Sequence, residues 1–77
     1  MSRDYTDSDA NRDRQEILGK ANDASFLRGR YLNLQAIIDN AQRCISGRGG
    51  PDDMDRYEEI QVAQGNLTLC QSLLSKL

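Results

Sequence analysis

Hydrophobic residues recur at steps of three and four between residues 17 and 45, which is the spacing of one face of an α-helix. This stripe consists of Ala24, Leu27, Tyr31, Leu34, Ile38, Ala41 and Ile45. A second stripe with the same spacing follows residue 51 and consists of Ile60, Ala63, Leu67, Cys70, Leu74 and Leu77. Alternating steps of three and four are typical of helices packed at a shallow angle. We therefore expect the two stripes to pack against each other in one seam.

Residues 47–51 separate the two stripes and contain Gly47, Gly49, Gly50 and the chain's single proline, Pro51. Glycine accepts the left-handed backbone that often ends a helix, and proline is favoured in a helix's first turn. The pattern predicts an all-α fold: an antiparallel two-helix hairpin with a helix at about 10–46, a turn at 47–51 and a helix at about 52–76.

We expect residues 1–77 to form a single helical-hairpin domain, because 77 residues are too few for two cores. Residues 1–8 are polar and are expected to fray. Thr6 and Asp9 nevertheless have the spacing of a capping box, so the first helix could begin anywhere from residue 7 to 13. Gly19 and Gly29 lie inside the expected first helix, where each is either simply tolerated or marks the close approach of another helix.

Further apolar residues lie beside the seam, and they include Leu18, Phe26, Leu32 and Ile37 before the turn. Counting outward from the turn leaves the first helix longer by about ten residues, so its start should overhang the second helix. Two helices cannot bury all of this surface, and exposed apolar patches usually mark interaction sites. The candidate partner-binding residues are Ile17, Leu18, Ala21, Phe26, Val62, Leu69 and Leu73.

Cys44 and Cys70 are the only cysteines. In the hairpin they would lie roughly 20 Å apart along the helices, whereas a disulfide needs Cα atoms within about 7 Å. We therefore expect two buried, reduced thiols that behave as small apolar residues.

The sequence offers no residue pattern for catalysis. It contains no histidine, so a Cys/His zinc site and a histidine general base are both excluded. Asp52, Asp53 and Asp55 suit the positive end of the second helix dipole but lack the order of a calcium loop. We expect no enzyme activity, no metal and no cofactor.

Charge and hydropathy narrow the possible partners. The net charge is −2, and basic residues are interspersed with acidic ones, which argues against nucleic acid as a partner. No run approaches the roughly 18 apolar residues of a membrane span. The first residues lack the apolar core of a signal peptide, so we expect a cytoplasmic protein without membrane contact.

The second half of the chain resembles a known family. Gly49-Gly50, Tyr57, Leu67, Cys70, Leu74 and Leu77 are similar in order to the second helix of the small co-chaperones of type III secretion needle subunits, the YscE/PscE/AscE/EscE group. The similarity covers residues 48–77, with a slightly longer loop at Pro51, and it extends to the first helix only in length and periodicity.

This resemblance implies a two-helix hairpin that binds and stabilises a tetratricopeptide-like chaperone in the bacterial cytoplasm. Together the two chaperones would hold the needle subunit and keep it monomeric. The alternative is a self-associating structural or regulatory hairpin, in which the same apolar stripes pack across a two-fold axis as a four-helix dimer. A lone co-chaperone could also form a homodimer through the same surface.

Overall fold

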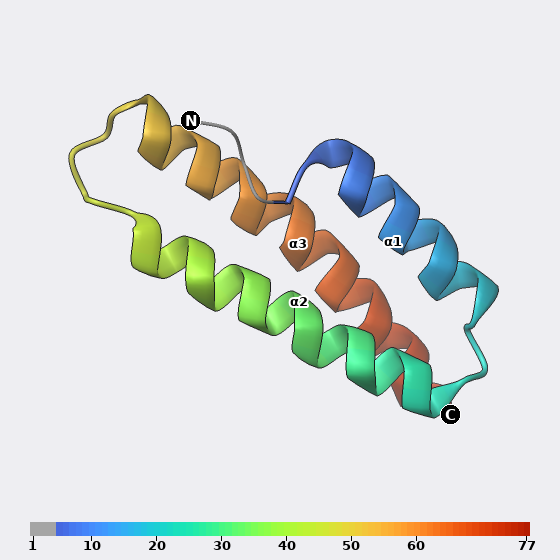
Figure 1. Cartoon of the computed structure of the whole chain (residues 1–77). Helices are drawn as coiled ribbons and strands as arrows, with labels where there is room; N and C mark the ends of the chain where they lie inside the picture. Colours follow the sequence, from blue (N-terminus) through green and yellow to red (C-terminus); the bar gives the residue numbers. More distant parts are fainter. Residues whose placement is uncertain (1–4) are drawn as a thin grey trace.

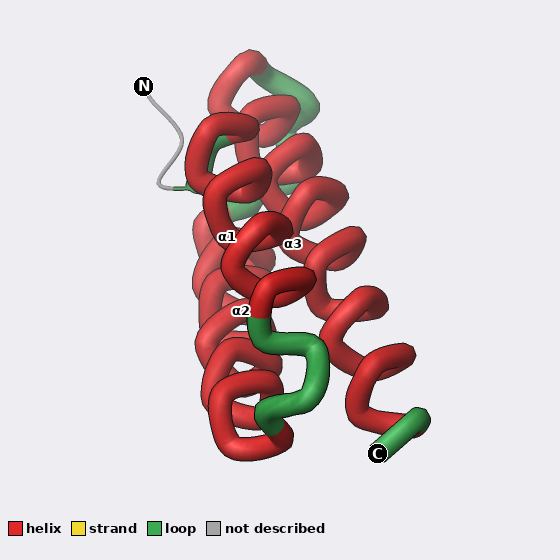
Figure 2. The backbone as a smooth tube through the Cα atoms, turned by 90° about the vertical axis from the view of Figure 1, so that its right-hand side faces the viewer, coloured by secondary structure: helices red, strands yellow, loops and turns green. Residues whose placement is uncertain are grey.

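The computed structural model describes residues 5–77, and these form three α-helices without a strand: α1 (Asp7–Gly19), α2 (Ala24–Cys44) and α3 (Pro51–Ser75). The all-α class is confirmed, but the two-helix hairpin is wrong because the chain before the turn forms two helices. The helices α2 and α3 are antiparallel, and α1 folds back over them (Figure 1). Viewed from the side, the three helices form one elongated bundle (Figure 2), which measures 42 × 19 × 14 Å.

The expected helix at 10–46 is interrupted at residues 20–23. Helix α1 ends at Gly19, and Lys20 is its C-cap. Asp23 then caps the start of α2, because its Oδ1 accepts a hydrogen bond of 3.0 Å from the backbone N–H of Phe26. Glycine, asparagine and aspartate all favour helix ends over helix interiors. The break therefore has a local cause in Gly19, Asn22 and Asp23, which the continuous apolar spacing concealed.

The N-terminal capping box predicted at Thr6 and Asp9 is confirmed. The Asp9 backbone N–H donates to Thr6 Oγ1, and the Thr6 backbone N–H donates to Asp9 Oδ2, each at 3.2 Å. Helix α1 begins immediately afterwards. Tyr5 is buried, with 5 % of its surface exposed. Within the segment expected to fray, residues 5–8 thus hold this buried side chain, the helix cap and the first residues of α1, and residues 1–4 lie outside the described residues.

The turn between α2 and α3 has the predicted chemistry. Gly47 and Gly49 have φ values of 82° and 72°, a left-handed backbone that side chains with a Cβ disfavour. Pro51 is the first residue of α3. The Asp53 carboxylate accepts hydrogen bonds from the backbone N–H groups of Ser46 at 2.9 Å, Gly47 at 3.0 Å and Gly49 at 3.1 Å. Asp53 therefore connects the loop at residues 46–49 to the first turn of α3. This is a role in addition to the predicted interaction with the helix dipole.

These hydrogen bonds change the acidity of Asp53. The hydrogen bond from the backbone N–H of Ser46 has the largest effect, and burial of the carboxyl opposes it. The backbone N–H of Gly49, the Ser46 hydroxyl and the backbone N–H of Gly47 have smaller effects. All of these hydrogen bonds favour the ionised carboxylate. They lower the pKa of the Asp53 carboxyl below its usual value.

The predicted seam between the two long helices forms the core. Its buried residues are Leu27, Leu34, Ile38 and Ala41 from α2 and Ala63, Leu67 and Cys70 from α3. The other predicted seam residues are less buried: Leu77 is exposed, and five are half-buried, namely Ala24, Tyr31, Ile45, Ile60 and Leu74. Cys70 is buried as expected, and burial raises the pKa of its thiol. Cys44 is exposed, so its predicted burial is wrong, and no disulfide forms between the two.

The bundle is as compact as an ordinary small monomer. Its accessible surface is 5004 Å², close to the roughly 4,700 Å² expected for a folded chain of this mass. At the mid-helix Gly29 and the terminal Gly19, no neighbouring part of the chain comes within 4 Å of the point that a Cβ atom would occupy. Neither glycine therefore marks the close approach of a helix: Gly29 is simply tolerated, and Gly19 is the last residue of α1.

Candidate interaction surfaces

One face of α3 lies against α1. Its residues are spaced three and four apart and therefore share a side of the helix; they are Glu59, Val62, Asn66, Leu69 and Leu73, here called the α1-facing stripe. Glu59 and Asn66 are buried and bond to Tyr5 and to the backbone of α1. Val62, Leu69 and Leu73 are half-buried and pack against the core. Helix α1 thus occupies the stripe predicted to meet a partner.

Tyr5 connects α1 to α3 through hydrogen bonds at both ends of the residue. Its backbone N–H donates to Glu59 Oε2 at 2.6 Å, and Glu59 Oε1 accepts from Arg56 at 3.2 Å. Its hydroxyl donates to Asp13 Oδ2 at 2.6 Å and accepts from Asn66 Nδ2 at 3.0 Å. Burial, and next the bond to Asp13, raises the pKa of the Tyr5 hydroxyl far above its usual value. The Tyr5 side chain is therefore a neutral donor at physiological pH.

Asp13 and Arg30 connect α1 to α2. Arg30 NH1 lies 3.1 Å from Asp13 Oδ1, and Arg30 NH2 lies 3.5 Å from Glu16 Oε1. The Arg30 guanidinium also lies 5.3 Å from the centre of the Phe26 ring, and Lys20 Nζ lies 5.5 Å from the same ring. Both distances fall within the range of cation–π attraction. The two ion pairs hold α1 against the Arg30 side of α2, and the ring contacts hold the Arg30 and Lys20 side chains against Phe26.

The buried polar groups along α1 are all paired. Among the described residues, every buried side-chain nitrogen or oxygen has a hydrogen-bond partner. Unpaired buried polar groups cost about 1–3 kcal/mol each, so this network favours one position of α1 over slightly shifted ones. We conclude that α1 is positioned by directional bonds as well as by apolar burial.

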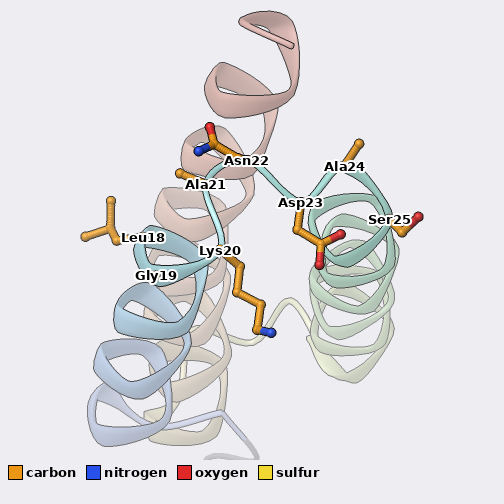
Figure 3. A pocket seen from close by; sticks show the side chains of 8 residues that line it. All are labelled: Leu18, Gly19, Lys20, Ala21, Asn22, Asp23, Ala24 and Ser25. Carbon is orange, nitrogen blue, oxygen red and sulfur yellow. The ribbon is translucent and has the colours of Figure 1, made fainter.

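The structure places the seven predicted partner-binding residues in three different environments. Ile17 is fully buried, so the predicted overhang is wrong: α1 turns back at residues 20–23 and buries this side chain. Leu18 is 50 % exposed and points away from the bundle (Figure 3). Ala21 is half-buried in the linker between α1 and α2. The remaining four are half-buried against the core: Phe26, Val62, Leu69 and Leu73.

Sequence reasoning missed the polar residues that hold α1. Glu59 and Asn66 continue the spacing of Val62, Leu69 and Leu73, which is the one signal that could have identified them. A polar residue on an apolar stripe is either a solvated position or a buried one with partners. Tyr5 and Asp13 carry no such signal, because their partners lie 54 to 61 residues away and 17 residues away in the sequence.

The opposite side of the hairpin is free of α1. Arg30 faces α1, and its neighbour Tyr31 is turned by about 100° away from it. On α3, the residues Tyr57, Ile60 and Leu74 lie on the other side of Ala63 from the α1-facing stripe. Tyr57 is 50 % exposed, and the rest are half-buried. We call this surface the seam edge: Tyr31, Tyr57, Ile60 and Leu74.

An open pocket lies at the connection between α1 and α2 (Figure 3). Its lining is one continuous segment, residues 18–25. The side chains of Lys20 and Asp23 lie on the inner side of the linker, between the two helices (Figure 3). This is a bend in the chain, without polar groups converging from separate elements as at a small-molecule site.

No metal-binding group of three or more histidine, cysteine, aspartate or glutamate side chains occurs within residues 5–77. No helix in that part of the chain has the length and hydrophobicity needed to cross a bilayer. In comparisons with known proteins, the chain matches no family model, no curated protein and no solved structure.

Proposed function

We propose that the chain is a non-enzymatic co-chaperone that binds and stabilises a tetratricopeptide-like chaperone. Through that partner it would help keep a type III secretion needle subunit monomeric in the bacterial cytoplasm. The nature of the partner rests on the resemblance of residues 48–77, which form most of the turn and α3. The observation that supports a binding role is the seam edge, an apolar surface that α1 leaves uncovered.

The shape and chemistry of the seam edge suit a helical-repeat partner. Tetratricopeptide repeats stack into superhelices with extended concave surfaces, and an elongated helix pair fits such a surface along its length. Tyr31 and Tyr57 combine a large apolar ring with a polar hydroxyl, which is why tyrosine is enriched in interfaces. Ile60 and Leu74 supply apolar area between and beyond the two tyrosines.

The test is co-expression with a tetratricopeptide-like secretion chaperone, followed by size-exclusion chromatography and titration calorimetry. A stable stoichiometric complex is expected. Replacing Tyr57 by alanine should weaken binding by about tenfold or more, because buried tyrosines are frequent hot spots. The matched control is Leu32→Ala, which removes a 65 % exposed side chain from the outer side of α2 and should leave affinity within about twofold.

Two results would contradict this proposal at different levels. Failure to form a complex with any such chaperone removes the functional assignment. If Leu18→Asp weakened the complex and Tyr57→Ala did not, the functional assignment would stand, but the interface would include Leu18 in place of the seam edge. Leu18 belongs to the surface predicted from the sequence, and its exposure makes the substitution tolerable for the fold.

A further inference from the structure

One series of apolar residues with heptad spacing runs through α1 and α2 and continues across the break between them. In α1 the inward-facing residues are Ala10, Asp13 and Ile17. Steps of seven residues from Ala10 give Ala10, Ile17, Ala24, Tyr31, Ile38 and Ile45, which are all apolar or aromatic. Steps of seven residues from Asp13 give Asp13, Lys20, Leu27, Leu34 and Ala41, which are apolar only from Leu27 onward, and Lys20 is exposed. A heptad spacing that continues through the break, as the first series does, is the pattern of one continuous helix.

The backbone of residues 20–23 presents no steric obstacle to such a helix. The chain's only proline is Pro51, and no non-glycine residue among those described has a positive φ. Lys20 has φ −122° and ψ 33°, and Asp23 has φ −100° and ψ 94°. Rotations about single backbone bonds separate these values from helical ones, and the largest of them, in ψ of Asp23, is about 135°. The bend therefore depends on weak local preferences at Gly19, Asn22 and Asp23.

A continuous helix would remove α1 from its site on the hairpin. It would extend α2 by residues 7–23, so the start of α1 would lie about 25 Å beyond the start of α2. Ile17, Glu59 and Asn66 would then lose their present covering, and Arg30 would lose Asp13 as its partner. An occupant of the vacated site must present a tyrosine, an aspartate and an isoleucine at the spacing of residues 5, 13 and 17. The α1 segment of a second copy of the chain presents all three.

We propose that two copies of this protein exchange α1 helices to form a symmetric dimer. In each copy α1 and α2 merge into one helix, and α1 docks on the α2–α3 hairpin of the other copy. Because Tyr5 lies beside Glu59 and Ala10 beside Asn66, α1 runs parallel to α3 and antiparallel to α2. The two long helices are therefore antiparallel, and the two-fold axis passes near residues 20–23. Exchange of identical elements reproduces the contacts between α1 and the hairpin, and only the bonds at residues 20–23 change.

The first test changes only the linker. Asn22→Ala with Asp23→Ala removes the cap of α2 and favours a continuous helix, so the dimer dissociation constant should fall by on the order of tenfold. Adding Ala24→Pro to this variant should raise the dimer dissociation constant by about a hundredfold. Proline suits the first position of α2 in the monomer but not the interior of a continuous helix. Sedimentation equilibrium with a reductant measures both constants and prevents exposed Cys44 from linking chains.

The second test asks whether α1 docks on the other copy. In Asp13→Arg two arginines face each other within a chain, and in Arg30→Asp two aspartates do. Mixed in equal amounts, the two variants can form opposite-charge pairs at both sites only by exchanging α1. Native mass spectrometry should show the mixed dimer at least about tenfold in excess over either homodimer.

Three outcomes would overturn the proposal. The variant with Asn22→Ala and Asp23→Ala could remain monomeric at millimolar concentration. It could form a dimer that Ala24→Pro leaves unchanged, which would indicate association through another surface such as the seam edge. The charge-exchanged variants could fail to form a mixed dimer. None of these outcomes depends on a secretion chaperone, so they leave the proposed co-chaperone function to its own test.

Discussion

Tyr5 is the residue on which the attachment of α1 most depends, because it contacts α3 at Glu59 and Asn66 and contacts α1 at Asp13. Its ring belongs to the buried core, while its hydroxyl completes the hydrogen bonding of two buried side chains. The residue therefore combines apolar burial with directional bonding at one position.

Replacing Tyr5 by phenylalanine keeps the ring but removes the hydroxyl, leaving Asp13 Oδ2 and Asn66 Nδ2 short of one partner. We expect the free energy of unfolding to fall by about 1–3 kcal/mol. Urea titration followed by circular dichroism measures the change. The control is Tyr57→Phe, because the Tyr57 side chain is half exposed and its change should stay within about 0.5 kcal/mol. Equal effects at the two positions would contradict the role assigned to the Tyr5 hydroxyl.

The burial of individual polar residues could not be predicted from the sequence, and the reason is physical. Asn66 and Glu59 are polar side chains, whose default position is the solvent, and only the arrival of Tyr5 from the far end of the chain makes their burial favourable. The same holds for Asp13, which is buried because Arg30 and Tyr5 meet it there. Cys44 shows the converse: it is an apolar-like residue, yet it is exposed at the last position of α2.

At the scale of elements, the prediction succeeded where the signals were local. The seam of α2 and α3 follows from apolar spacing, and the turn follows from Gly47, Gly49 and Pro51. The feature that the sequence reasoning did not predict was the break between α1 and α2 at residues 20–23. Its signals are weak, and the heptad frame that continues through it favours an unbroken helix. The excess apolar surface that suggested a partner is largely the docking site of α1.

The packing of α1 as an element can be measured with two adjacent residues. Ile17 is fully buried, whereas Leu18 is 50 % exposed. We expect Ile17→Ala to lower the free energy of unfolding by about 2–5 kcal/mol. Leu18→Ala should change it by less than about 0.5 kcal/mol. Chemical denaturation of both variants checks this, and a large effect at Leu18 with a small one at Ile17 would mean that α1 presents a different face.

The turn between α2 and α3 should show a pH dependence that Asp53 controls. Its folded pKa is lowered, so its ionised form contributes stability above the unfolded pKa of about 3.9, and this contribution disappears as pH falls through the lower folded pKa. The Asp53→Asn variant has no carboxylate at this position and therefore lacks this pH-dependent stabilisation. The stability difference between wild type and variant should therefore be largest near neutral pH and shrink below about pH 4.

Thermal unfolding at several pH values measures this difference. Asp39→Asn is the matched control, because Asp39 is exposed on α2 and its substitution should change stability by less than about 0.5 kcal/mol at each pH. A wild type that exceeds the Asp53→Asn variant by the same amount at acidic and neutral pH would contradict the role given to the carboxylate.

For the molecule as a whole, three helices bury apolar surface that a two-helix hairpin would leave exposed. The expected hairpin would have left apolar stripes exposed on both helices, and a chain of this size has little stability to spare. Folding α1 back brings the surface area close to that of an ordinary monomer of the same mass. Helix α1 thus covers much of the apolar surface that argued for a partner, and the uncovered seam edge is the surface that remains for the proposed partner.

The contacts of Tyr5 also bear on when α1 can dock as the chain is synthesised. Glu59 and Asn66, the α3 partners of Tyr5, are added to the growing chain 54 and 61 residues after it. Helix α1 therefore lacks its docking site until α3 has been made. Of the three described helices, the first to be translated is thus the last to be placed, and in the proposed exchange its site belongs to another copy of the chain.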